Sequence, residues 1–164
     1  MPAVCSSVDK LDKMSWEDVE KELIEMKGLT KQQTEKIWEF VKRKGSPFEI
    51  LAEVRELKVF GDHKIANEAL DEMELLFNYC QAFGCLNNIS FDFSLARGLD
   101  YYTGLVYEAV LLEGTQLGSI AGGGRYDNLI GMFSGRKIPA VGVSIGIERM
   151  FLLLEEKAKA QNTI

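Results

Sequence analysis

The chain has 164 residues, of which 46% are hydrophobic, 10% aromatic and 27% charged. This composition is typical of a folded soluble protein and excludes a disordered tail, a collagen-like repeat and a mini-protein that depends on disulfides. The formal net charge of −6 provides no general basic field, so any contact with nucleic acid must be local.

The cysteine pattern and the apolar runs bear on the compartment. Cys5, Cys80 and Cys85 form no CxxC pair and cannot all pair with one another, which favours a reducing environment. No apolar run approaches the roughly 20 residues of a transmembrane span, and the amino terminus lacks a secretory signal pattern. We therefore expect a cytoplasmic protein without a membrane partner.

Residues 1–88 contain four of the 15 glycines and predict consecutive amphipathic helices. Ser15 begins a helix that stops at Gly28. The second helix is expected to begin with a capping box of Thr30 and Gln33 and to end at Gly45. The third is expected to begin at Ser46, Pro47 and Glu49. The fourth is expected to cover 64–83 and to end at Gly84. Four helices with short connections predict a small helical bundle.

From Ile89 the hydrophobic period changes to two, which indicates strands. The predicted strands cover 89–95, 105–112, 119–121 and 140–144, and helices are expected over 125–132 and 146–160. Short connections favour antiparallel pairing. The fold class expected for the chain is α+β.

Three stretches of the second half concentrate groups that could carry chemistry: RGLDYYTG (97–104), AGGGRYD (121–127) and GVSIGIER (142–149). Arginine, acid and tyrosines between two strands suggest a ligand pocket, and three consecutive glycines allow a backbone to approach a ligand closely. An arginine in the first turn of a helix can bind a phosphate with its forked guanidinium.

Each stretch also has an ordinary structural interpretation. The first could be a tight turn with an ion pair, the second a loop, and Glu148 with Arg149 a solvated pair. The glycines match neither GxGxxG nor GxxxxGK[ST], which excludes a Walker-type nucleotide site. His63 is expected to be a surface loop residue, and no second histidine or paired cysteine offers a metal site.

In this order the three stretches resemble the two histidine-specific signatures and motif 3 of the histidyl-tRNA synthetases, which are class II aminoacyl-tRNA synthetases. The preceding segment resembles the helical insertion of the eukaryotic-type cytosolic enzymes. The resemblance implies a ligase that joins L-histidine to ATP, with Mg²⁺ accompanying ATP as cosubstrate, and transfers the product to histidine tRNA.

The resemblance also implies residue roles. Arg97 would lie between the histidine carboxylate and the α-phosphate as the catalytic cation. Tyr101 and Tyr102 would lie in the histidine pocket, with the Tyr102 hydroxyl bound to the imidazole. Tyr126 would be a second pocket tyrosine.

The remaining implied roles are in the backbone and at the ATP. Gly122, Gly123 and Gly124 would let the backbone approach the amino acid, and Arg149 would hold ATP together with Arg97. Asn128 departs from the glycine that is usual in the family.

The family's motifs 1 and 2 and its anticodon-binding domain are expected outside these residues. The implied segment is a helical insertion at 1–88 and the C-terminal half of the catalytic core at 89–164. It is expected to be inactive alone, and the parent enzyme is expected to be a homodimer. Two alternatives stay open: a regulatory or histidine-sensing protein of the same fold, and a module whose helical half binds RNA or protein, although its net charge of −5 disfavours strong RNA binding.

Overall fold

The computed structural model describes residues 2–96, 101–112, 118–136 and 138–161. The chain divides into two compact units, residues 1–96 and residues 97–164. The first unit is mainly helical and the second contains an antiparallel sheet with helices, which confirms the expected α+β class. The boundary between the units follows Ala96, whereas the change in sequence pattern follows Asn88.

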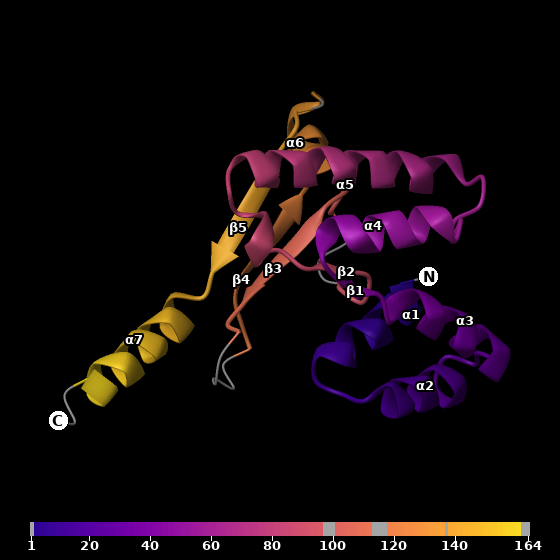
Figure 1. Cartoon of the computed structure of the whole chain (residues 1–164), viewed down its shortest axis with the longest axis horizontal. Coiled ribbons are helices and arrows are strands. Elements are labelled where there is room, and N and C mark those ends of the chain that lie inside the picture. Colours follow the sequence, from indigo (N-terminus) through magenta and orange to yellow (C-terminus); the bar gives the residue numbers. More distant parts are fainter. Residues whose placement is uncertain (1, 97–100, 113–117, 137, 162–164) are drawn as a thin grey trace. The chain divides into compact units, whose positions relative to one another are not determined.

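The first unit contains five α-helices and a two-residue strand pair among its described residues (Figure 1). In chain order its elements are α1 (Pro2–Val8), the 3-10 turn η1 (Asp9–Asp12), α2 (Trp16–Glu25), α3 (Lys31–Val41), β1 (Lys44–Gly45), α4 (Pro47–Glu56), α5 (Lys64–Ala82), η2 (Leu86–Asn88) and β2 (Phe91–Asp92).

Local capping signals explain where several of these helices begin. The Ser15 hydroxyl accepts a hydrogen bond from the Asp18 N–H at 3.3 Å, as predicted. The predicted capping box at the start of α3 is complete, because the Gln33 N–H donates to the Thr30 hydroxyl and the Gln33 side chain accepts from the Thr30 N–H at 2.9 Å. His63 is exposed as expected, but it also caps α5 by accepting from the Ala66 N–H.

Two of the predicted helix boundaries differ from the structure. Gly45 does not end α3, which stops at Val41; Gly45 instead pairs with Phe91 in the short β1–β2 ladder. The Ser46 side chain caps no backbone N–H of the described chain, and Pro47 alone marks the start of α4. The segment 2–12 forms α1 and η1, which the apolar pattern did not predict.

The main core of the first unit lies between α4 and α5. Its buried members are Ile50, Leu51, Val54, Leu70 and Phe77. Phe91 and Phe93 pack against this cluster, with the rings of Phe77 and Phe91 5.2 Å apart. The predicted strand over 89–95 is therefore reduced to Phe91–Asp92, because the alternating phenylalanines cover a helical core.

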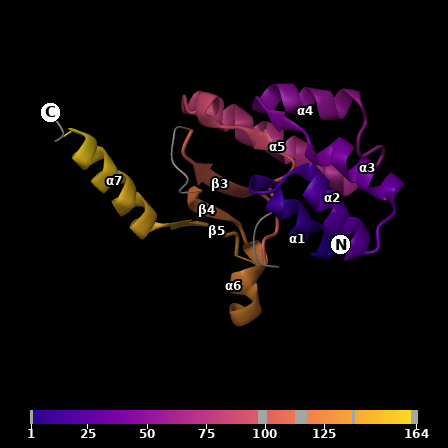
Figure 2. The same cartoon turned by 90° about the horizontal axis from the view of Figure 1, so that it is seen from below.

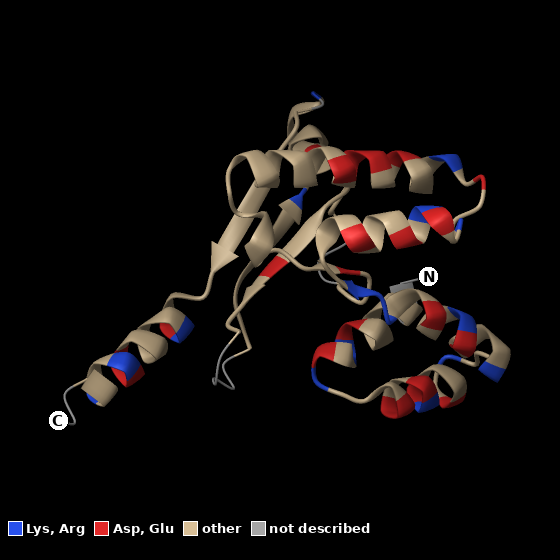
Figure 3. Ribbon diagram, viewed as in Figure 1, with Lys and Arg blue, Asp and Glu red and all other residues tan. Residues whose placement is uncertain are grey.

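Charged residues are frequent along the helices of the first unit, whereas the strands of the second unit carry few (Figure 3). Among the described residues, no helix combines the length and the apolar content needed to cross a membrane.

The second unit contains β3 (Val106–Val110), β4 (Ser119–Arg125), α6 (Asp127–Ser134), β5 (Val141–Ile145) and α7 (Ile147–Gln161). The strands form one antiparallel sheet in the order β3-β4-β5, which confirms the predicted pairing. In Figures 1 and 2, α7 projects away from the end of β5 instead of covering the sheet.

The second unit buries little apolar surface. Of its described residues only Gly124 and Asp127 are buried. Val141, Val143 and Ile145 alternate along one face of β5 and are each more than half exposed, as are Ile147 and Phe151 of α7. This unit therefore presents a broad apolar surface.

Phe77→Ala should lower the free energy of unfolding by about 3–5 kcal/mol, because it leaves a cavity in the buried core between α4 and α5 where Phe77 packs against Phe91. Phe83→Ala, at a side chain that is 85% exposed beyond the end of the same helix, is the matched control and should change it by less than about 0.5 kcal/mol. Urea denaturation followed by circular dichroism measures both, and equal effects would contradict this account of the core.

Candidate ligand site on the glycine-rich strand

The three consecutive glycines lie in the central strand of the sheet, not in a loop. Gly122, Gly123 and Gly124 pair with β3 on one side and with β5 on the other. Strand β4 extends to Arg125, beyond the predicted end at Ala121. Glycine is unfavourable inside a strand unless another group approaches the backbone closely, so the neighbours of each glycine explain its presence.

On one face of the sheet, Tyr107 lies across Gly123. Its hydroxyl donates a hydrogen bond to the Gly142 carbonyl oxygen at 2.7 Å. A Cβ at Gly123 would overlap that same carbonyl oxygen and lie 2.7 Å from the Tyr107 hydroxyl. The absence of a side chain at Gly123 therefore allows Tyr107 to reach β5.

On the opposite face, tyrosines of two signatures meet over Gly124 and Gly142. A Cβ at Gly124 would lie 2.8 Å from the Tyr102 ring, and one at Gly142 would collide with the Tyr126 hydroxyl. The Tyr101 and Tyr102 ring centroids are 4.8 Å apart, and the Tyr101 and Tyr126 centroids are 5.9 Å apart. The predicted pocket tyrosines thus form one cluster.

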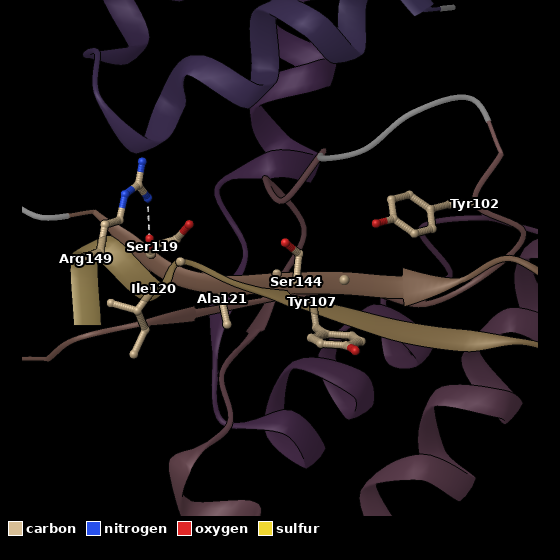
Figure 4. A pocket seen from close by; sticks show the side chains of 10 residues that line it. Tyr102, Tyr107, Ser119, Ile120, Ala121, Ser144 and Arg149 are labelled. Carbon is tan, nitrogen blue, oxygen red and sulfur yellow. Dashed lines mark hydrogen bonds between the residues drawn. The ribbon is translucent and has the colours of Figure 1, made fainter. Parts of the chain in front are cut away.

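An open hollow of about 310 Å³ adjoins this cluster (Figure 4). Its lining residues come from the loop before β3, all three strands and the first turn of α7: Tyr102, Tyr107, Ser119, Ile120, Ala121, Gly122, Gly123, Ser144, Gly146 and Arg149. Figure 4 shows Tyr102, Ser144 and Arg149 on one side of the sheet and Tyr107 on the other. Ser144 pairs with Gly122 and Tyr107 with Gly123, so their side chains leave opposite faces.

Four of the eight predicted site residues meet at this hollow. Tyr102, Gly122, Gly123 and Arg149 line it directly. The Arg149 guanidinium donates a hydrogen bond to the Ser119 carbonyl oxygen at the start of β4.

The other predicted residues are placed differently. Tyr101 and Tyr126 pack around Tyr102, and Gly124 lies beneath its ring, without lining the hollow. Arg97 lies outside the described residues.

A buried carboxylate holds the surrounding segments together. Asp127 is 6% exposed and accepts hydrogen bonds from the Arg125 guanidinium at 2.6 Å and from the Ala140 N–H at 3.0 Å. Its own N–H donates to the Thr103 hydroxyl at 3.1 Å. Asp127 thus joins the first signature, the end of β4 and the start of β5, which keeps their tyrosines in register.

Sequence reasoning missed Asp127, Tyr107, Gly142 and Ser144. Asp127 belongs to the quoted AGGGRYD stretch but was given no role, and Gly142 begins GVSIGIER. Glycines at matching positions of two strands are a signal of close approach that could have identified Tyr107 and Tyr126 as their cover.

Interactions among the tyrosines hold the Tyr102 phenol in its neutral form. A hydrogen bond with Tyr101 is the largest cause that raises the pKa of Tyr102 above its ordinary 10.0, followed by burial and by the phenols of Tyr107 and Tyr126. A neutral phenol can both donate and accept a hydrogen bond.

The described residues contain no cluster of three or more histidine, cysteine, aspartate or glutamate side chains that could hold a metal ion. The polar groups that the hollow offers are a phenol on each side of the sheet, hydroxyls, backbone and one guanidinium. These groups suit a small ligand with hydrogen-bonding and anionic parts.

Comparison with solved structures gives the class of protein. A histidyl-tRNA synthetase from Nostoc sp. PCC 7120 superposes with a TM-score of 0.84 and 36% identity, over 96% of this chain and 37% of that one. The fold is therefore that of a class II aminoacyl-tRNA synthetase segment. A Bacillus halodurans protein described as an ATP phosphoribosyltransferase regulatory subunit/histidyl-tRNA synthetase, 21% identical with a TM-score of 0.66, shares the fold.

Sequence comparisons identify the family. A family model described as histidyl-tRNA synthetase matches residues 8–150, and the chain belongs to this family. The cytoplasmic histidine–tRNA ligase of Dictyostelium discoideum is 51% identical over 160 residues, covering 98% of this chain and 33% of the relative. The mitochondrial ligase of Homo sapiens is 46% identical over 97% of this chain and 33% of its own length. The chain thus spans about a third of these relatives.

Gly123→Ala should destabilise the second unit by about 1–3 kcal/mol or more, because the new methyl group collides with backbone that cannot move aside without breaking the β4–β5 ladder. Gly146→Ala is the matched control, since its methyl would lie 3.4 Å from the Ile120 carbonyl oxygen, an ordinary contact. Thermal unfolding followed by near-ultraviolet circular dichroism reports on the tyrosine cluster, and equal melting curves would contradict the packing described.

Tyr102→Phe should reduce the loss of stability at alkaline pH. The folded chain holds the Tyr102 proton more tightly than the unfolded chain, so this contribution is complete below the ordinary tyrosine pKa and is lost as the pH rises through the raised pKa. Urea unfolding between about pH 9 and pH 11 should show a shallower decline for Tyr102→Phe than for the original chain. Tyr79→Phe, at an exposed tyrosine of α5, should leave the decline unchanged.

Proposed function

We propose that this chain is part of an ATP-dependent histidine–tRNA ligase and that its second unit supplies the histidine-binding half of the active site. The observation that carries the proposal is the convergence of Tyr102, Gly122, Gly123 and Arg149, from three separate signatures, on one hollow. Its volume of about 310 Å³ lies at the lower end of the roughly 300–1,000 Å³ typical of small-molecule sites.

In this proposal, the tyrosine cluster recognises the imidazole of L-histidine. A tyrosine hydroxyl is protonated at neutral pH, and the tyrosine contacts raise the pKa of Tyr102 further, so this hydroxyl can donate to an unprotonated ring nitrogen or accept from a ring N–H. Tyr101 and Tyr126 restrict the Tyr102 ring by packing against it. Gly122, which lines the hollow and has no side chain, allows the ligand to approach the backbone of β4.

The proposed ATP contacts are cationic. Arg149 reaches the edge of the hollow from the first turn of α7, where its guanidinium can stack on a base or pair with a phosphate. Arg97 is assigned by resemblance to the cation between the histidine carboxylate and the α-phosphate, where it would offset the negative charge that develops during adenylate formation. Mg²⁺ would enter with the phosphates of ATP as part of that cosubstrate.

The proposed domain organisation follows the same resemblance: a helical insertion at 1–88 and the C-terminal half of the catalytic core at 89–164. The exposed apolar residues of β5 and α7 support membership of a larger core, because such a surface is unfavourable in water. Histidine tRNA as substrate, a homodimeric parent enzyme and a cytoplasmic location are parts of the proposal. The cytoplasmic name of the Dictyostelium relative supports that location.

The ligase is favoured over a regulatory or histidine-sensing protein of the same fold. Relatives at 51% and 46% identity are named histidine–tRNA ligases, whereas the protein described partly as a regulatory subunit is only 21% identical. The residues assigned to substrate contacts, including Arg97, Tyr102, Tyr126 and Arg149, are all present.

Calorimetric titration of L-histidine into the chain tests the amino-acid site. Tyr102→Phe should weaken binding about fivefold, the equivalent of the net contribution of about 1 kcal/mol from one hydrogen bond. Tyr79→Phe makes the same chemical change at an exposed position of the first unit and should leave the affinity unchanged. Equal affinities for the two variants would contradict the role of Tyr102.

Replacement of the matching segment of the Dictyostelium ligase by residues 1–164 tests the reaction itself. The chimera should support histidine-dependent ATP–pyrophosphate exchange, and Arg97→Ala within it should abolish most of that exchange. A chimera that folds and binds histidine but exchanges no pyrophosphate would favour the sensing alternative.

A further inference from the structure

The end of helix α5 brings two thiols together outside the ligand hollow. Phe83 is the C-cap that follows the last helical residue, Ala82; Gly84 adopts a left-handed φ of +71°, and the chain then turns back over the helix. The Cys85 N–H donates to the Cys80 carbonyl oxygen at 3.0 Å, and the Gly84 N–H donates to the Gln81 carbonyl oxygen at 3.0 Å. This pair of bonds is a Schellman motif, in which the side chains at the two ends of the outer bond normally meet in an apolar contact.

Here both contacting positions are cysteines. The Cys85 thiol donates to the Cys80 carbonyl oxygen at 3.4 Å, so its sulfur already lies over the end of the helix. Burial, followed by the nearby Cys85 thiol and a hydrogen bond to it, raises the pKa of Cys80. Both cysteines are free and partly exposed, which leaves a path for a small reagent.

We propose that Cys80 and Cys85 form a peroxide-oxidisable dithiol that closes to a disulfide across the end of α5. The Schellman turn brings the two backbones within hydrogen-bonding distance, with the Cys85 nitrogen 3.0 Å from the Cys80 carbonyl oxygen, and a disulfide requires a short separation between the bridged residues. In a reducing compartment such a bond is transient, which suits a redox-responsive site better than a structural staple.

The chemistry balances with a hydroperoxide as the oxidant. One thiolate attacks a peroxide oxygen, the O–O bond breaks and the thiol becomes a sulfenic acid. The second thiolate attacks that sulfur, the S–O bond breaks and the S–S bond forms. With hydrogen peroxide, the two thiols lose two electrons and two protons, and one peroxide becomes two water molecules. The raised pKa of Cys80 disfavours its thiolate, the form that attacks the peroxide.

This inference does not depend on the proposed ligase function, and its test uses no substrate. The test uses the whole chain carrying Cys5→Ser, because Cys5 is an exposed thiol that could link two molecules. After treatment with hydrogen peroxide, the intact monomer should become lighter by two hydrogen atoms. Both cysteines lie between Lys64 and Arg97, so one tryptic peptide should carry the loss, and a reductant should reverse it.

Two further variants separate a built dithiol from an ordinary helix-end contact. Adding Cys80→Ser or Cys85→Ser to the Cys5→Ser chain should abolish the two-hydrogen loss, and circular dichroism should confirm that each variant keeps its helices. The proposal is overturned if the folded Cys5→Ser chain keeps two alkylatable thiols after oxidation. It is also overturned if that chain forms only intermolecular disulfides or separately oxidised cysteines.

Discussion

At the centre of the three-stranded sheet, aromatic rings occupy the space that side chains of β4 and β5 would otherwise fill. Tyr107 crosses Gly123 on one face, while Tyr102 and Tyr126 cover Gly124 and Gly142 on the other. The strands β4 and β5 can pair beneath these rings only because each of these positions is a glycine, which has a hydrogen atom in place of a side chain. Because the glycines leave this room, tyrosines from distant parts of the sequence can lie beside one hollow.

The Asp127 carboxylate complements this packing with directed bonds. It holds the guanidinium at the end of β4 and the N–H before β5, while its own N–H binds Thr103 beside the tyrosines. Glycine-rich strands are flexible when unpaired, so such bonds compensate for the entropy lost when the strand becomes ordered. Packing and hydrogen bonding therefore fix the tyrosine cluster from two sides.

Much of the fold could be predicted because its signals are local. Ser15, Thr30 and Gln33 act within one helical turn, and the structure places them as caps. The predicted strand over 89–95 was too long, because the alternation of apolar and polar residues reports only that one side of the segment is buried. Phe91 and Phe93 bury that side against helices, and only Phe91–Asp92 is a strand. Gly45 was misassigned because its partner Phe91 lies far along the sequence.

The candidate site was also predicted in part. The tyrosines and Arg149 could be named from their signatures, but the central-strand position of the glycines depends on pairing with β3 and β5, which local sequence does not specify. Tyr107 and Asp127 act through neighbours in other elements, so their roles emerge only in three dimensions.

The uneven burial of the two units affects how often each unit opens locally and exchanges its amide hydrogens. Amide hydrogens of α5 lie above a packed aromatic core, whereas those of β5 and α7 belong to elements whose apolar side chains remain exposed. Local opening requires the disruption of buried contacts, so deuterium should enter the second unit through frequent small fluctuations and reach the centre of α5 only when the first unit unfolds. The unit that carries the candidate ligand site is thus expected to open locally more often than the core of the first unit.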